Sequence, residues 1–335
     1  MMAKAKIAIN GFGRIGRLVF RGIYNDKELQ VVAINDLTDA KTLAHLLKYD
    51  TAHGKMNAEI SHTENSIIVD GVEYPVYAEK DPAMLPWKKL GVDIVVEGTG
   101  RFVTVEGSQK HIEAGAKKVL ITAPSKTDSV KTIVYSVNEN TLNKDDVIVS
   151  AASCTTNSLA PVMNVLENEF GVVKGYMTTV HSYTADQRLQ DAPHADLRRA
   201  RAAASNIIPT STGAAKSIGK VIPNLKGKMN GIALRVPTIT GSLVDLTVEL
   251  KKDTSVEEIN QAMKKAASES FIYSDEPLVS SDVIASTAGS IFDSQLTAAL
   301  EVDGKKLYKI YSWYDNESSF VHQYIRTLKH LAKLL

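Results

Sequence analysis

The chain has 335 residues, 44% of them hydrophobic, and a formal net charge of +1. This length favours two domains over one, and the near-neutral charge argues against an overall field that would recruit nucleic acid or a membrane surface. A single cysteine excludes an intrachain disulfide framework, and because no apolar signal region or bilayer-length stretch is present, we expect a cytoplasmic protein.

Strand and helix patterns alternate through the first 150 residues. An apolar run at 6–10 predicts a strand, and apolar positions within 14–24 repeat with helical spacing. Further elements of both kinds follow, with strands at 31–34, 93–96, 119–121 and 147–149, a helix at 42–48, and a hairpin of 66–69 and 73–76 around Asp70-Gly71. This alternation predicts an α/β domain with a Rossmann-type, doubly wound, mostly parallel sheet.

A glycine-rich turn joins the first strand to the first helix. Its sequence, G-F-G-R-I-G at residues 11–16, has the spacing of dinucleotide-binding turns, and Asp36 ends the second strand about twenty residues later. A carboxylate there accepts hydrogen bonds from both ribose hydroxyls and repels a 2′-phosphate, which favours NAD over NADP. An ordinary glycine turn beside an unrelated aspartate is the alternative, and the strand–turn–helix context disfavours it.

The cysteine, Cys154, lies where the strand at 147–149 passes into a helical pattern ending near Phe170. Free amides and the dipole at a helix N-terminus favour the thiolate, the reactive form of cysteine. A buried structural thiol is the alternative. The polar neighbours favour catalysis, since they leave room for a substrate and can donate hydrogen bonds; they are Ser153, Thr155, Thr156 and Asn157.

The second half has a different character. Longer apolar runs predict the strands of a mixed or antiparallel sheet, at 175–183, 232–236, 243–250 and 307–313, in an α+β domain, and a capping box at 255–258 opens a helix that runs to about 268. Residues 184–206 predict a long ordered loop with a helical piece at 197–204.

The last stretch, 319–335, carries an apolar helical stripe that we expect to pack back against the first domain. The predicted domains are therefore 1–152 joined by 319–335, and 153–318.

Acid–base and anion-binding candidates lie in this second half. His181 ends a strand-like run, and its imidazole could take a proton from a thiol, although the sequence alone leaves its pairing with Cys154 open. The arginines at 198, 199 and 201 could bind phosphate or form surface ion pairs. Arg235 is a lone charge in an apolar strand, which predicts either a buried ion pair or an anionic ligand.

Taken together, these motifs resemble the phosphorylating glyceraldehyde-3-phosphate dehydrogenases, of the NAD-dependent bacterial glycolytic type. The resemblance covers essentially the whole chain. Its most specific motifs are A-S-C-T-T-N at 152–157, N-G-F-G-R-I-G at 10–16, H-S-Y-T at 181–184, T-G-A-A-K at 212–216 and W-Y-D-N-E at 313–317.

The resemblance implies oxidation of glyceraldehyde 3-phosphate to 1,3-bisphosphoglycerate with NAD and inorganic phosphate. Cys154 would add to the aldehyde, His181 would act as base and hold the thiolate as an ion pair, and phosphate would attack the resulting thioester. The implied cofactor-binding residues are Gly11, Phe12, Gly13, Arg14, Ile15, Gly16, Asp36, Lys80, Thr122 and Asn316. The implied substrate- and phosphate-binding residues are Ser153, Thr155, Thr184, Arg199, Thr212, Gly213 and Arg235.

The resemblance further implies a homotetramer with the long loop at a subunit interface, no metal site, and no dedicated nucleic-acid or membrane binding. Some positions depart from the commonest family pattern without removing a group that the mechanism needs: Gly98, Ala151, Ser158, Ala192 and Phe320.

Three other functions compete with this interpretation. Erythrose-4-phosphate dehydrogenase uses the same cysteine, histidine and cofactor, so motifs discriminate it poorly. A semialdehyde dehydrogenase is disfavoured by Arg198-Arg199 and Thr212-Gly213. A binding protein that merely keeps the fold would retain its partner when Cys154 is replaced by serine, whereas an enzyme would lose turnover.

Overall fold

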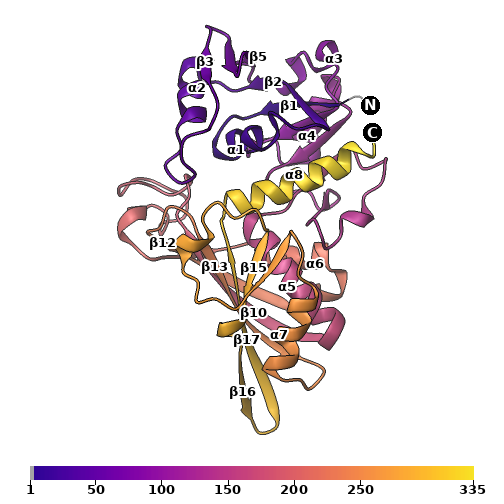
Figure 1. Ribbon diagram of the computed structural model, residues 1–335, viewed down its shortest axis with the longest axis vertical. Helices are drawn as coiled ribbons and strands as arrows, with labels where there is room; N and C mark the ends of the chain where they lie inside the picture. Colours follow the sequence, from indigo (N-terminus) through magenta and orange to yellow (C-terminus); the bar gives the residue numbers. More distant parts are fainter. Residues whose placement is uncertain (1–3) are drawn as a thin grey trace. The chain divides into compact units, whose positions relative to one another are not determined.

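The computed structural model describes residues 4–335, and the contacts divide the chain into two compact units (Figure 1). The first unit comprises Met1–Ile133, Asn138–Ala152 and Tyr324–Leu335. The second comprises Val134–Val137 and Ser153–Gln323. The functional domain boundaries given above stay a prediction.

The first unit is built on a nine-stranded sheet with the order β3-β4-β5-β2-β1-β6-β7-β9-β8. All strand pairs from β5 to β8 in that order are parallel, and the β3-β4-β5 end is antiparallel. The strands are β1 (Ala5–Asn10), β2 (Leu29–Asn35), β3 (Ile60–His62), β4 (Ser66–Val69), β5 (Val72–Tyr77), β6 (Ile94–Glu97), β7 (Lys118–Ile121), β8 (Lys131–Thr132) and β9 (Ile148–Ser150). The predicted Rossmann-type sheet is confirmed.

The first unit combines buried strands with amphipathic helices. Strands β6 and β7 are buried at every position, as expected for parallel strands covered on both faces. The helices of this unit are α1 (Arg14–Ile23), α2 (Ala40–Lys48), α3 (Trp87–Leu90) and α4 (Val105–Glu113), with short 3₁₀ turns at Pro82–Met84 and Glu139–Thr141.

The C-terminal helix α8 (Ser318–Ala332) contributes its later turns to the first unit. Its Tyr324 hydroxyl donates to the Leu120 carbonyl at 2.6 Å, and Lys329 pairs with Asp26 at 2.5 Å. A Cβ added to Gly22 of α1 would lie 2.4 Å from the Ile325 side chain, which shows how closely the two helices approach. Of the segment expected to pack on the first domain, Tyr324–Leu335 belong to the first unit.

The second unit contains a mixed, mostly antiparallel sheet with the order β11-β12-β10-β13-β17-β15-β14, and β16 pairs with β17. Only β10–β12 and β14–β15 are parallel among its pairs in the described chain. The strands are β10 (Val172–Ser182), β11 (Ile208–Ser211), β12 (Met229–Val236), β13 (Ser242–Leu250), β14 (Phe271–Ser274), β15 (Ser290–Asp293), β16 (Ala298–Val302) and β17 (Lys305–Tyr314). The predicted mixed sheet is confirmed.

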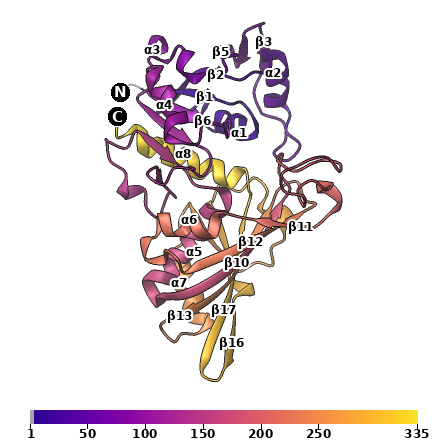
Figure 2. The same cartoon turned by 180° about the vertical axis from the view of Figure 1, so that it is seen from behind.

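Three helices pack against this second sheet, α5 (Cys154–Phe170), α6 (Ala214–Val221) and α7 (Val256–Lys265), seen from behind in Figure 2. Helix α5 contacts β10, β13, β15 and β17 and also packs against α6 and α7. Ser255 and Glu258 form the predicted capping box of α7, which ends at Lys265. Short 3₁₀ turns occur at Ala203–Ser205, Pro223–Leu225, Ser280–Val283 and Ser294–Leu296.

The helix predicted at 197–204 is wrong. The chain forms turns over 197–200 and a 3₁₀ turn at Ala203–Ser205. Asp191 accepts from the Ala202 N–H at 2.9 Å, so this amide does not bond the carbonyl four residues earlier, as a helix over this range would require.

No helix within residues 4–335 combines the length and the apolar character that crossing a bilayer requires.

Candidate functional site

A cavity of about 310 Å³ lies at the carboxyl ends of β1, β2 and β6 in the first unit. This is the edge of an open α/β sheet where ligands bind. Four predicted cofactor residues line it, namely Gly11, Gly13, Asp36 and Lys80, and the other lining residues are Asn10, Asn35, Leu37, Glu79, Gly98, Thr99, Arg101 and Phe102.

The glycines of the turn at 11–16 are required by geometry. Gly11 has φ +90°, and a Cβ there would lie 2.7 Å from the Thr99 nitrogen. A Cβ on Gly16 would lie 2.1 Å from the Gly11 carbonyl oxygen, so helix and turn approach as the motif predicts. A Cβ on Gly13 would meet nothing within 4 Å, which leaves open space beside the first turn of α1.

Asp36 is held beside this turn. Its Oδ2 accepts from the Phe12 N–H at 2.7 Å and its Oδ1 accepts from the Thr38 N–H at 3.0 Å. The Phe12 ring is buried in the core against Phe20, so the part of Phe12 that reaches this site is its backbone amide. The carboxylate is therefore fixed on the cavity wall.

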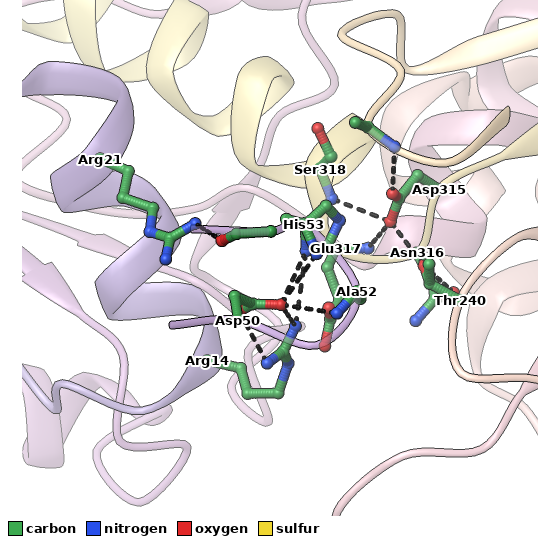
Figure 3. Close-up of polar contacts among 12 residues, drawn as sticks. Arg14, Arg21, Asp50, Ala52, His53, Thr240, Asp315, Asn316, Glu317 and Ser318 are labelled. Atoms are coloured by element: carbon green, nitrogen blue, oxygen red, sulfur yellow. Dashed lines mark hydrogen bonds and ion pairs between the residues drawn. The ribbon is translucent and has the colours of Figure 1, made fainter. Parts of the chain in front are cut away.

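Arg14 is engaged by a carboxylate. Its guanidinium donates two hydrogen bonds to Asp50, at 2.9 and 3.1 Å, and Asp50 also accepts from the Ala52 and His53 amides (Figure 3). Although burial opposes the shift, the Arg14 contact and the backbone hydrogen bonds lower the pKa of Asp50 to about 2. The structure thus gives Arg14 a fixed position near the first turn of α1. Ile15 and Thr122 are absent from the walls of the cavity within the described chain.

Asn316 belongs to the second unit. Its Oδ1 accepts from the Thr240 hydroxyl at 3.0 Å and from the Ser242 hydroxyl at 3.2 Å. The neighbouring Asp315 bonds the Thr240 hydroxyl at 2.7 Å and the backbone amides of residues 317 and 318 (Figure 3). The Asn316 amide is therefore oriented by hydroxyls on its carbonyl side.

The cysteine is the first residue of α5, and Ser153 caps the helix. The Ser153 hydroxyl accepts from the Thr156 N–H at 3.1 Å, so the predicted helix N-terminus is confirmed. The Cys154 Sγ lies 3.4 Å from the His181 Nε2. The structure thus brings together the thiol and the imidazole that the sequence left unpaired.

The hydrogen bonds of His181 define its tautomer. Its Nδ1 lies 2.6 Å from the Ser182 carbonyl oxygen, which can only accept, so Nδ1 carries the proton. This leaves Nε2 as a bare acceptor facing the thiol. The imidazole is therefore oriented to take a proton from Cys154.

The electrostatics of this pair differ from the expectation based on the helix terminus alone. Burial raises the pKa of the Cys154 thiol, although Arg235 acts to lower it. Burial and the charge of Arg235 lower the pKa of His181 to about 3. The helix N-terminus was expected to favour the thiolate, and burial opposes this effect, because desolvation disfavours the charged forms of both the thiol and the imidazole.

An anion-binding cluster adjoins His181. The register of the parallel strands β10 and β12 sets His181 beside Arg235. Arg235 donates to the Thr184 hydroxyl at 2.9 Å and the Ser182 carbonyl at 3.3 Å, and its Nη1 lies 3.2 Å from His181 Nδ1. Its buried Nε has no partner in the described chain. Since a buried guanidinium N–H is costly to leave unpaired, this cluster can accept an anionic ligand.

Arg199 joins the cluster through Asp186. Arg199 Nη1 lies 2.5 Å from Asp186 Oδ2, and the Thr184 hydroxyl donates to the same carboxylate. Arg199 also donates to the Thr210 hydroxyl at 2.9 Å and the Ser211 carbonyl at 3.2 Å, next to Thr212 and Gly213. Of the predicted phosphate residues, the structure thus gathers Thr184, Arg199 and Arg235, and it sets Arg199 at the loop that holds Thr212 and Gly213.

Thr155 is placed differently. Its hydroxyl is buried and lies 2.8 Å from the Tyr314 hydroxyl, which also bonds Thr179 at 2.7 Å. Burial raises the pKa of Tyr314, and its ring stands edge-on to His181 with centroids 6.0 Å apart.

Asp186 and Tyr314 lie in the site but were not predicted as site residues from the sequence. A carboxylate two positions after Thr184 and a tyrosine in the W-Y-D-N-E segment were the available signals.

Comparison with known proteins agrees with this geometry. The chain matches two family models, "Glyceraldehyde 3-phosphate dehydrogenase, NAD binding domain" over residues 5–105 and "Glyceraldehyde 3-phosphate dehydrogenase, C-terminal domain" over residues 153–316. It is 60% identical over 337 residues to a glyceraldehyde-3-phosphate dehydrogenase of Mycoplasma pneumoniae, covering 100% of both chains. It is 55% identical to those of Clostridium pasteurianum and Clostridium acetobutylicum, covering 98% of this chain and 99% of each relative.

Proposed function

The chain belongs to the glyceraldehyde-3-phosphate dehydrogenase family, and from this premise we propose how its residues carry out the reaction. Its activity is the NAD-dependent oxidation of glyceraldehyde 3-phosphate in glycolysis, with inorganic phosphate as co-substrate and 1,3-bisphosphoglycerate as product. The observation that carries the proposed mechanism is the 3.4 Å contact between Cys154 Sγ and His181 Nε2 beside the Arg235 and Arg199 guanidinium groups.

Proton transfer within this pair starts the reaction. The bare Nε2 of His181 takes the thiol proton as Sγ attacks the aldehyde carbon, and the imidazolium then protonates the oxyanion to give a hemithioacetal. Proton transfer accompanies the attack, because burial disfavours the charged forms of both groups. His181 then removes the hydroxyl proton as the hydride leaves, and the product is a thioester on Cys154.

The two arginines supply positive charge for phosphate groups. We assign the substrate phosphate to Arg235 and Thr184, because they adjoin His181 and the Arg235 Nε lacks a partner among residues 4–335. We assign the attacking phosphate to Arg199 with Ser153, Thr212 and Gly213, and we leave out the Thr155 hydroxyl, because it is buried against Tyr314. Attack of phosphate on the thioester carbon breaks the C–S bond and releases the Cys154 thiolate, which takes back the proton that His181 holds from the oxidation step.

The residues around the cavity of the first unit fit NAD, which when bound accepts the hydride. The open space at Gly13, the first-turn amides of α1 and the Asp36 carboxylate match the needs of a pyrophosphate and a ribose diol. We assign Lys80 to the wall of this site and Asn316 to the carboxamide end of the cofactor. We further propose a homotetramer in which residues 184–206 lie at a subunit interface; exposed Leu189 and Leu197 in this loop support it.

The test is NADH formation from glyceraldehyde 3-phosphate and NAD, run with and without inorganic phosphate. We expect fast turnover that depends on phosphate and that is abolished in Cys154→Ser. Erythrose 4-phosphate is the comparison substrate. Faster turnover of erythrose 4-phosphate with little dependence on phosphate would overturn the proposal in favour of the sister activity.

A further inference from the structure

A chain of buried hydrogen bonds runs beneath the cavity of the first unit. It starts at Trp87, whose indole Nε1 donates to His111 Nδ1 at 3.0 Å. The other ring nitrogen, His111 Nε2, lies 3.0 Å from Glu97 Oε2. The side chains of Glu97 and His111 are 0% exposed, and Trp87 is also fully buried. Neither titratable group has a role in the proposed reaction.

The indole fixes the protonation pattern of this chain. An indole N–H can only donate, so His111 Nδ1 must be the bare nitrogen. The ring proton therefore lies on Nε2 and points at the Glu97 carboxylate. His111 is held as a relay with one acceptor side and one donor side.

Donors surround the Glu97 carboxylate. Its Oε2 accepts from the Asn10 amide at 2.6 Å as well as from His111, and its Oε1 accepts from the Thr99 N–H at 2.9 Å and from the Thr99 hydroxyl. A carboxylate can accept about four such bonds, and these donors offset the cost of burying its charge. Glu97 thereby ties the end of β1 and the turn after β6 to helix α4.

The hydrogen-bond network continues from Asn10 through Asn35 to the backbone of Glu79. Asn35 Nδ2 donates to Asn10 Oδ1 at 2.7 Å and to the Glu79 carbonyl at 2.9 Å, and Asn35 Oδ1 accepts from the Glu79 N–H at 2.9 Å. Asn10, Asn35, Glu79 and Thr99 all line the cavity. One continuous hydrogen-bond network therefore sets the positions of four residues that line the cavity.

We propose that Glu97 and His111 are positioning residues for the cofactor, which hold the adenosine side of its cavity in the binding conformation through Asn10 and Thr99. This rests on the proposed use of that cavity for NAD. The two residues act through the walls and leave the chemistry at Cys154 unchanged.

Glu97→Gln is the discriminating substitution, because a carboxamide cannot satisfy this shell. With its NH₂ toward Asn10 and His111 it faces two donors. With its NH₂ toward Thr99 it faces the Thr99 N–H. His111 cannot relieve the conflict by changing tautomer, because its Nδ1 must accept from Trp87. In either orientation of the new carboxamide, at least one N–H points at another N–H in a buried site.

The experiment measures binding of NAD and of ADP-ribose by calorimetry to the wild-type and Glu97→Gln proteins, together with steady-state kinetics. We expect the dissociation constants of both ligands to rise about tenfold, since one unpaired buried group gives a factor of that order. KM for NAD should rise by a similar factor while kcat at saturating NAD stays close to wild type. ADP-ribose lacks only the nicotinamide, so an equal loss for both ligands places the effect on the ADP-ribose part of the site and excludes the nicotinamide end.

Asp293→Asn is the matched control. Asp293 is also a buried carboxylate that accepts from an indole, Trp313 Nε1 at 3.0 Å, but it lies in the second unit. The Asp293→Asn substitution should lower the melting temperature without changing the dissociation constant of NAD or of ADP-ribose. If Glu97→Gln does not fold, His111→Gln, which keeps one donor and one acceptor, is measured with a smaller loss expected.

Wild-type affinity in a folded but less stable Glu97→Gln or His111→Gln protein would overturn the proposal and leave a purely structural role. Failure of the proposed function is a separate result, because it would show in the wild-type protein as absent NAD binding or absent phosphate-dependent turnover.

Discussion

Asp186 joins the two arginines of the anion cluster: its Oδ2 lies 2.5 Å from Arg199 Nη1, and it accepts the hydroxyl of Thr184, which in turn accepts from Arg235. The carboxylate therefore takes up donors that an incoming phosphate needs. The charges of Arg199 and Arg235 and the Thr184 hydrogen bond lower the pKa of Asp186, although burial opposes them, so it is anionic at neutral pH.

Asp186→Asn should tighten phosphate binding, because the internal competitor loses its charge. The Asp186 side chain is 43% exposed, so solvent screening limits the gain to about two- to fivefold in KM for inorganic phosphate, the factor that an interaction of up to about 1 kcal/mol gives. The measurement is initial rate against phosphate at constant ionic strength. Asp191→Asn, in the same loop and paired with Arg201, is the control. A raised KM would instead mean that Asp186 chiefly orients Arg199.

His181→Asn should lower kcat by about 10²–10⁴-fold, the usual contribution of a general base. KM for glyceraldehyde 3-phosphate should change little, because Arg235 and Thr184 remain. Steady-state kinetics at saturating NAD and phosphate provide the test. His62→Asn, an exposed histidine of β3, should behave as wild type. A loss confined to KM would contradict the assignment of His181 as base.

Arg235→Leu should make Cys154 less reactive toward iodoacetamide in the substrate-free protein. The Arg235 charge acts to lower the pKa of the Cys154 thiol, so its removal raises that pKa and reduces the thiolate fraction at any fixed pH. The pH–rate profile of alkylation should therefore move to higher pH. Arg201→Leu, which removes an exposed guanidinium paired with Asp191, should leave the profile in place. A shift to lower pH would show that Arg235 acts mainly through His181.

Asp36→Ala should weaken the preference for NAD. Loss of a charged hydrogen-bond acceptor costs about tenfold or more in kcat/KM with NAD, and removal of the repulsive charge should raise kcat/KM with NADP. Both cofactors are compared in the forward assay. An unchanged NAD/NADP ratio would place ribose recognition on another residue of the cavity wall.

Much of the fold could be predicted because its signals are local. The apolar runs of β6 and β7, the glycine turn at 11–16 and the capping box at 255–258 each specify their own backbone conformation within a few residues. The helix expected at 197–204 did not form, since the Ala202 amide is taken by Asp191, eleven residues earlier, through a contact that helical periodicity does not reveal.

The sequence motifs predicted the residues of both candidate sites, but not which of these residues contact one another. Cys154 and His181 are 27 residues apart, and His181 and Arg235 are 54 apart; only the register of β10 and β12 makes the latter two neighbours. The electrostatics of Cys154 show the same limit. A helix terminus is visible in the sequence, whereas the burial that raises the thiol pKa is not.

The sequence by itself determined the family through the resemblance of its motifs. It also determined the parallel sheet with its dinucleotide turn and a cysteine at a helix N-terminus, because periodicity, glycine geometry and helix capping act over a few residues. The tertiary structure alone decided that Asp186 joins two arginines, that Tyr314 lies against His181, and that Glu97 and His111 underlie the cofactor cavity. Such contacts depend on strand register and on desolvation, which are set only when distant segments pack together.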